Sequence, residues 1–168
     1  MSAFPLAYHI TFGTYGTRLH GDPRGTVARP MNRPGDRYIE HDPSWHRMER
    51  SRLRYHPVRL TQDQRIFVES SIPDLCCRGH WKYITSACQT DYVHVLLSGA
   101  RAGDSIRRLL KRWLSQAMSA ANGDQDDAPW WAEGGSVRSV TSDRYLESAF
   151  RYVREQCLSQ NGRLRKPG

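Results

Sequence analysis

The sequence predicts an α+β fold in which helices cover one face of an antiparallel β-sheet. Three observations favour this fold. Short segments alternate apolar and polar residues as strands do, and longer segments repeat apolar residues at three-and-four spacing as amphipathic helices do. These segments follow one another in the order β-α-β-β-α-β-α. The length of 168 residues suits one domain, residues 1–168, because single domains cluster at roughly 100–150 residues.

The first predicted strand covers residues 6–15, where β-branched and aromatic residues alternate with smaller ones. Residues 16–60 follow as a loop-rich, arginine-rich stretch that contains Gly-Asp-Pro and His-Asp-Pro turns and has no clear period. Such a length inside a compact domain indicates a functional insertion. We expect this basic insertion to order partly on a binding partner.

A first helix is expected over residues 62–78, because Thr61 can cap it. Pro73 is expected to kink or break this helix, since proline lacks the amide hydrogen that a helix interior needs. Residues 81–90 and 91–98 then predict two tightly joined strands, the second of them strongly apolar and β-branched. They form a central hairpin.

A second helix is expected from about residue 103 to 121. Its apolar stripe consists of Ile106, Leu109, Leu110, Trp113, Leu114, Ala117 and Met118. A last strand is expected within 134–140, followed by a last helix over 142–160 that Ser142 or Asp143 can cap. The first six elements match the split β-α-β, or ferredoxin-like, pattern, and the last helix is an addition to it.

The charge of the chain points to an anionic polymer as partner. Lysine and arginine total 25 against 17 acidic residues, a net charge of +8, and only three of the 25 are lysines. Arginine binds phosphate through two parallel hydrogen bonds and stacks on bases, which favours nucleic acid. No apolar run approaches the roughly 20 residues of a membrane span, and the first residues lack the order of a secretion signal. We therefore expect a soluble, cytoplasmic protein with reduced cysteines and no membrane partner.

Two pairs of residues are candidates for chemistry. Tyr92 and His94 lie two apart on a strand and so share one face. Tyr152 and Gln156 lie four apart on the last helix, beside its apolar stripe, and so project as neighbours. Each pair alone is also typical of ordinary structure, a hydrogen-bonded core histidine or a polar helix surface.

Taken together, these residues belong to a recognisable ordered set of segments. The set is Leu6-Ala7-Tyr8-His9-Ile10-Thr11, Thr14-Tyr15-Gly16-Thr17, Leu19-His20-Gly21-Asp22-Pro23-Arg24-Gly25, Val93-His94-Val95, Gly135-Ser136-Val137-Arg138 and Tyr152-Val153-Arg154-Glu155-Gln156. In this order the chain closely resembles the single-tyrosine HUH transposases, and most of all their REP-associated tyrosine transposase (RAYT) branch. The resemblance covers residues 5 to 160.

The resemblance implies a ferredoxin-like sheet, a homodimer, single-stranded or hairpin DNA as substrate, and DNA transposition as the activity. It implies that Tyr152 is the nucleophile that forms a 5′-phosphotyrosine, and that His94 and Gln156 hold a magnesium or manganese ion. Assistance by a metal ion makes physical sense. A phenol with an ordinary pKa near ~10 attacks a phosphodiester at neutral pH only where a cation stabilises the developing negative charge.

The chain departs from the family pattern at the first histidine of the motif, which is Tyr92 here, preceded by Asp91 in place of asparagine. A neutral phenol is a weaker ligand than imidazole for a divalent ion. Tyr92 as phenolate, Asp91, or His9 from the neighbouring first strand are the candidates to complete the site. We hypothesise that His9 faces the same pocket as His94.

Eight arginines are candidates for contacts with the DNA backbone, four in the insertion, three on the second helix and one in the last strand. They are Arg18, Arg24, Arg29, Arg33, Arg107, Arg108, Arg112 and Arg138. A solvated helix face is the alternative explanation for the helix arginines. Three functions stay open: a DNA-cleaving and rejoining transposase, a degenerate or domesticated relative that binds structured single-stranded DNA without cutting it, and a domain that binds RNA through aromatic residues on its sheet.

Overall fold

The computed structural model describes residues 3–19, 41–123 and 127–160. Four strands form one antiparallel sheet in the order β2-β3-β1-β4. The strands are β1 (Ala7–Gly13), β2 (Lys82–Cys88), β3 (Tyr92–Ser98) and β4 (Ser136–Val140). With one helix between β1 and β2 and one between β3 and β4 packed on the sheet, this is the predicted ferredoxin-like topology.

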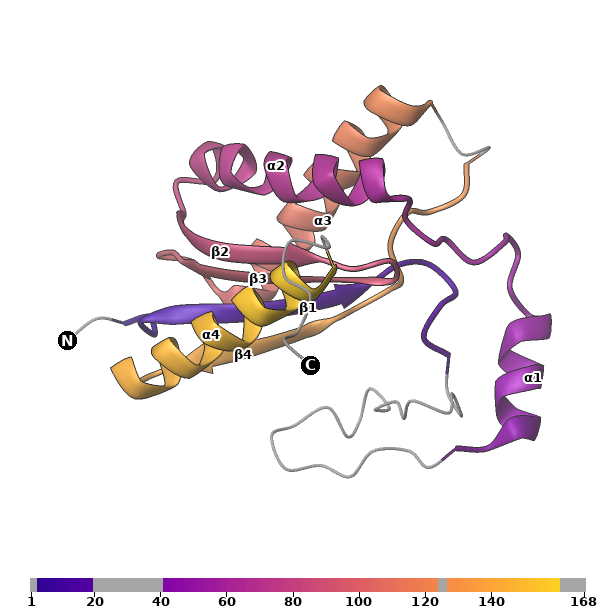
Figure 1. Cartoon of the computed structure of the whole chain (residues 1–168), viewed down its shortest axis with the longest axis horizontal. Helices are drawn as coiled ribbons and strands as arrows, with labels where there is room; N and C mark the ends of the chain where they lie inside the picture. The colour runs from indigo at the N-terminus through magenta and orange to yellow at the C-terminus, as the bar shows by residue number, and fades with distance from the viewer. Residues whose placement is uncertain (1–2, 20–40, 124–126, 161–168) are drawn as a thin grey trace.

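The helices cover both faces of the sheet (Figure 1). α2 (Gln62–Arg78) and α3 (Gly103–Asn122) pack on one face, and α4 (Asp143–Gln160), the added C-terminal helix, packs on the other. Within the described ranges, no helix is both long and apolar enough to cross a membrane.

The pleat of β1 and β3 divides their side chains between the two faces. The apolar residues that join α2 and α3 in the main core are Tyr8, Ile10, Phe12, Val93, Val95 and Leu97. The alternate residues face α4, where a second, smaller core joins Ala7, Leu96 and Val140 to Ala149 of α4. Beside this smaller core, β1 and β3 present the polar residues His9, Thr11 and His94 to the same face, so a polar centre of the sheet lies under α4.

α2 begins at Thr61, whose side chain forms a reciprocal capping box with Gln64. The break expected at Pro73 is wrong, because the helix is continuous from Gln62 to Arg78 with Pro73 inside it. Ile72 and Cys76 on either side of the proline are fully buried in the main core. We attribute the continuity to this packing, which offsets the hydrogen bond that proline cannot make.

The insertion contains a helix that the sequence analysis did not predict, α1 (Pro43–Ser51). Asp42 caps it through hydrogen bonds from the backbone N–H groups of Ser44 and Trp45, and Pro43 stands in its first turn. α1 buries none of its residues and projects from the body of the protein (Figure 1). The sequence analysis missed α1 because the helix has only 9 residues and buries none of them in a core. The Asp-Pro start was the available signal.

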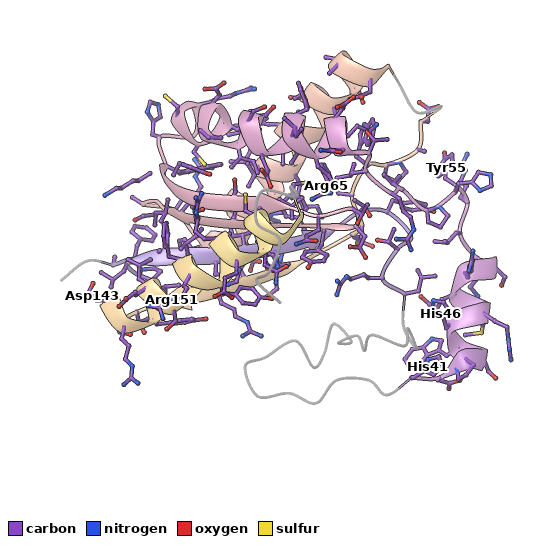
Figure 2. The ribbon with its side chains drawn as sticks, viewed as in Figure 1. His41, His46, Tyr55, Arg65, Asp143 and Arg151 are labelled. Carbon is purple, nitrogen blue, oxygen red and sulfur yellow. The ribbon has the colours of Figure 1, made fainter. Side chains whose placement is uncertain are left out.

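Two side chains of α2 protect the edge strand β2. Glu69 Oε1 accepts a 2.8 Å hydrogen bond from the backbone N–H of Cys88, and Arg65 Nε donates a 3.0 Å bond to the Cys88 carbonyl. Arg65 points from α2 toward the sheet (Figure 2). An edge strand otherwise offers such groups to a second chain. The Cys88 thiol is buried beside them, as expected for a packing cysteine.

Candidate active site

Two imidazoles meet on the α4 face of the sheet. His94 on β3 lies directly opposite Thr11 on β1, and His9 lies two residues before Thr11 on the same face. His94 Nδ1 is 2.8 Å from Thr11 Oγ1 and 3.1 Å from His9 Nε2. The predicted placement of His9 in the same pocket as His94 is therefore confirmed.

Both imidazoles are held in their neutral form at neutral pH. Burial, followed by the charges of His9 and Arg18, lowers the pKa of His94 to about 3. Burial and then the charge of Arg138 lower the pKa of His9. Each neutral ring carries one N–H donor and one acceptor nitrogen, so the pair can hydrogen-bond a ligand without adding charge.

Tyr152 on α4 lies over this pair. Its ring centroid is 5.4 Å from that of His94 and 6.1 Å from that of His9, with the rings edge to face. Ala149 and Val153 on either side of it in the helix are buried against the sheet, while 47% of Tyr152 is exposed. The phenol is thus held by a packed helix and is still open to solvent and to a large ligand.

Gln156, one turn further along α4, is bound to the sheet. Its Oε1 accepts a 2.8 Å hydrogen bond from the Tyr92 hydroxyl and a 2.8 Å bond from Gln89 Nε2. The Tyr92 ring lies 5.1 Å from His94. The structure therefore brings together all five residues predicted for catalysis and metal binding: Tyr152, His94, Gln156, Tyr92 and His9.

The donors in this cluster do not fit a divalent metal ion as they are arranged. Both lone pairs of the Gln156 carbonyl oxygen are used by hydrogen bonds, and the Tyr92 hydroxyl acts as a donor. Four of the candidate ligands, His94, Gln156, Tyr92 and His9, are neutral, whereas magnesium prefers carboxylate oxygens. The one candidate carboxylate, Asp91, is paired with Arg18. Within the part of the chain that the structure describes, no three His, Cys, Asp or Glu side chains are grouped to hold a metal. Binding of the predicted ion would require the Tyr92 and Gln89 hydrogen bonds to break first.

Two arginines bring positive charge to the cluster from opposite sides. The Arg18 guanidinium lies 4.6 Å from the centroid of the Tyr92 ring, and its Nε is 3.9 Å from Asp91 Oδ2. Its side chain is 39% exposed. Arg138 on β4 is exposed, and it lies directly opposite His9 and hence on the same face. Arg18 is therefore positioned by an aromatic ring and an ion pair, yet can still reach a ligand.

A short turn after β1 fixes the approach of Arg18. The hydroxyls of Thr14 and Thr17 are 2.9 Å apart, and the backbone N–H of Thr14 donates to the Asp91 carbonyl at 2.9 Å. Both threonines are buried. The turn thus joins the end of β1 to the start of β3, next to Tyr92.

The other predicted DNA-binding arginines are not part of this cluster. Arg107, Arg108 and Arg112 belong to α3, which covers the opposite face of the sheet. Arg107 is bound there, to the Gly135 carbonyl at 2.8 Å and to Asp104 at 3.1 Å. Arg108 and Arg112 are exposed. Arg24, Arg29 and Arg33 lie outside the described residues.

Two residues of the cluster were missed by the sequence analysis. Thr11 shares a face with His9 by the period of two, so the strand pattern could have identified it. Gln89 lies in the turn between β2 and β3, where no periodicity applies. Its contact with Gln156 depends on where α4 crosses the sheet, so the sequence carried no signal for it.

No family model matches the chain, and no curated protein matches it. Among solved structures, the chain is similar to one described as "a putative transposase" from Deinococcus radiodurans R1. The two are 15% identical, the match covers 91% of this chain and 92% of that one, and the TM-score is 0.45.

Proposed function

We propose that this protein is a transposase of the single-tyrosine type, which cleaves and rejoins single-stranded DNA through a covalent bond to Tyr152. The observation that carries the proposal is the position of the Tyr152 phenol over the His9 and His94 pair, exposed on the sheet face that Arg18 and Arg138 flank. A nucleophile, neutral hydrogen-bonding groups and two cations are the parts that phosphoryl transfer to a phenol requires.

The proposed step exchanges one phosphate ester bond for another. The Tyr152 oxygen attacks the phosphorus, the bond from phosphorus to the 3′ oxygen breaks, and the 5′ phosphate stays on the tyrosine. The phenol proton passes to solvent, and the leaving 3′ oxygen takes up a proton. Because the phosphotyrosine keeps the energy of the diester, the reverse step rejoins a strand without ATP.

We assign to Arg18 and Arg138 the stabilisation of the negative charge that develops on the phosphate in the transition state. The metal donors do not fit as arranged, whereas a guanidinium can bind two phosphate oxygens and needs no rearrangement of Gln156. The negative phosphate would also favour the protonated forms of His9 and His94, in which both ring nitrogens carry an N–H donor. A divalent ion remains the competing proposal for the same charge.

A second candidate function is a relative that binds structured single-stranded DNA and does not cut it. The hydrogen bond between Tyr92 and Gln156 favours this alternative, because it closes the position where a metal ligand is expected. Both candidates share the DNA substrate and differ in the covalent step.

A covalent-adduct assay separates the two. The protein is incubated with a labelled single-stranded hairpin DNA, with manganese in one arm and EDTA in the other, and resolved by denaturing electrophoresis. A shifted protein–DNA band that Tyr152→Phe abolishes and Tyr145→Phe retains supports the proposal, since Tyr145 lies on the same helix. Tight binding with no adduct in either arm supports the second candidate. Light scattering with and without the hairpin tests the homodimer that the resemblance implies.

A further inference from the structure

We propose a second DNA-contacting site, a basic groove between α1 and the start of α2 that binds the backbone of the single strand beyond the segment at Tyr152. This inference rests on the proposed function. The groove has a volume of about 740 Å³. Its lining includes Arg50, Arg54, Tyr55, His56 and Arg59.

The charge of the groove fits a polyanion. Arg50, Arg54 and Arg59 are all exposed. Among the described residues that line the groove, none is acidic. Three exposed guanidinium groups, with no carboxylate among the described lining residues, favour binding of the phosphates of a nucleic-acid strand, whose neutralisation releases bound counterions.

Tyr55 adds an aromatic surface to this charge. It is half-buried, its ring lies 6.1 Å from the Tyr15 ring in an edge-to-face contact, and the Arg54 guanidinium lies 5.3 Å from its centroid. Figure 2 shows Tyr55 beyond the end of the sheet, on the connection that leaves α1. An anchored ring beside a guanidinium is a stacking site of the kind that single-strand binding proteins use for bases.

Backbone hydrogen bonds attach the wall of the groove to the candidate active site. The N–H of Val58 donates to the Tyr15 carbonyl at 2.8 Å, and the N–H of Leu60 donates to the Thr90 carbonyl at 2.8 Å. Tyr15 belongs to the turn that carries Arg18, and Thr90 precedes Asp91, with which Arg18 pairs. A DNA strand bound at Arg18 is therefore expected to continue past the turns at Tyr15 and Thr90 into the groove.

Close packing at Gly16 supports the same connection. Gly16 has a φ of +72°, and a Cβ there would lie 3.0 Å from Leu53 Cδ1 and 3.2 Å from Pro57 Cα. Leu53 and Pro57 line the groove. The turn before Arg18 and the wall of the groove thus pack as one unit, which keeps the two sites at a fixed spacing.

The test measures DNA binding without cleavage. Fluorescence anisotropy follows a labelled single strand of about 20 nucleotides on Tyr152→Phe protein, with or without the added pair Arg54→Gln and Arg59→Gln. The matched control is Arg101→Gln with Arg144→Gln, two exposed arginines at the opposite end of the sheet. Both pairs remove the same charge, and circular dichroism checks that both proteins stay folded.

We expect the groove pair to weaken binding about tenfold and to lower the salt slope by about 1.4, the value for two phosphates on a single strand. The control pair should change affinity less than about threefold. Tyr55→Ala should weaken binding as well, and Tyr55→Phe should restore it, because phenylalanine keeps the stacking face.

Equal losses in the groove pair and the control pair would overturn the groove while leaving the Tyr152 proposal intact. A selective loss of binding in the Tyr152→Phe protein, together with no adduct from the protein that keeps Tyr152, would support the groove and overturn cleavage. Competition by polyglutamate as strong as that by unlabelled DNA would overturn the nucleic-acid assignment of the groove.

Discussion

The hydroxyl of Tyr92 donates a 2.8 Å hydrogen bond to Oε1 of Gln156, which joins β3 to α4 beside the proposed nucleophile. The resemblance noted from the sequence predicts that Tyr92 replaces the first histidine of the HUH motif and that Gln156 is a metal ligand. The bond therefore links the two residues whose hydrogen bonding, in the proposed reaction, separates charge stabilisation by arginine from charge stabilisation by a metal ion. It also holds the helix that positions Tyr152.

Replacing Tyr92 by histidine should create a metal site. Tyr92→His removes the donor that occupies Gln156 Oε1 and adds an imidazole next to His94. We expect manganese affinity to rise at least tenfold, measured by calorimetric titration. Tyr92→Phe is the control, since it also removes the donor and adds no ligand. Equal manganese affinity in Tyr92→His and Tyr92→Phe would argue against a latent metal site.

Arg18 should matter for the rate of adduct formation more than for folding. Removing one preorganised donor to a developing charge typically costs about 100-fold in rate, and we expect a loss of that order for Arg18→Gln in single-turnover adduct assays. Arg18→Lys should recover part of the rate, because lysine restores the positive charge but cannot donate the two parallel hydrogen bonds of a guanidinium. Wild-type adduct formation should persist in EDTA. Complete loss in EDTA with recovery in manganese would assign the charge to a metal.

The buried His94 should make the protein sensitive to acid. Its pKa is about 3 in the folded state and near 6.5 in the unfolded chain, so the unfolded state takes up the proton first as the pH falls. The free energy of unfolding should therefore be largest above pH 6.5 and decrease between pH 6.5 and 3. Linkage gives a decrease of about 2 kcal/mol from pH 7 to pH 5 from this group. Urea denaturation at the two pH values should show a smaller decrease in His94→Gln; an unchanged decrease would contradict the neutral assignment.

Gly135 should be essential for the position of Thr11, the hydroxyl partner of His94. Gly135 has a φ of +129°, and a Cβ there would lie 2.6 Å from the Thr11 carbonyl oxygen. Gly135→Ala should lower the free energy of unfolding by more than about 2 kcal/mol, through backbone strain and overpacking. Gly134→Ala is the control, because Gly134 has a φ of +80° and open space around its Cβ position. Gly134→Ala should lower the free energy of unfolding by about 1 kcal/mol in the same denaturation experiment. Equal losses in Gly134→Ala and Gly135→Ala would show that backbone strain, and not the close approach to Thr11, causes the loss.

The local patterns of the sequence determined much of the fold. The period of two in β3 placed Tyr92 and His94 on one face, and the spacing of four in α4 placed Tyr152 beside Gln156. Thr61 marked the start of α2 through its capping box. These features depend on residues close in the chain, whose geometry is set by backbone dihedral angles and side-chain periods.

The tertiary structure decided what these residues contact. The pairing of β1 with β3 set Thr11 opposite His94 and brought His9 into contact with the His94 ring. The crossing of α4 over the sheet placed Gln156 where it accepts hydrogen bonds from Gln89 and Tyr92. The turn after β1 brought Arg18 to Tyr92, and core packing kept α2 continuous across Pro73. Each contact joins segments far apart in the sequence, and strand register and helix crossing depend on how whole apolar faces pack. The chain by itself therefore identified the residues of the candidate site, and only the packed fold decided how they are bonded.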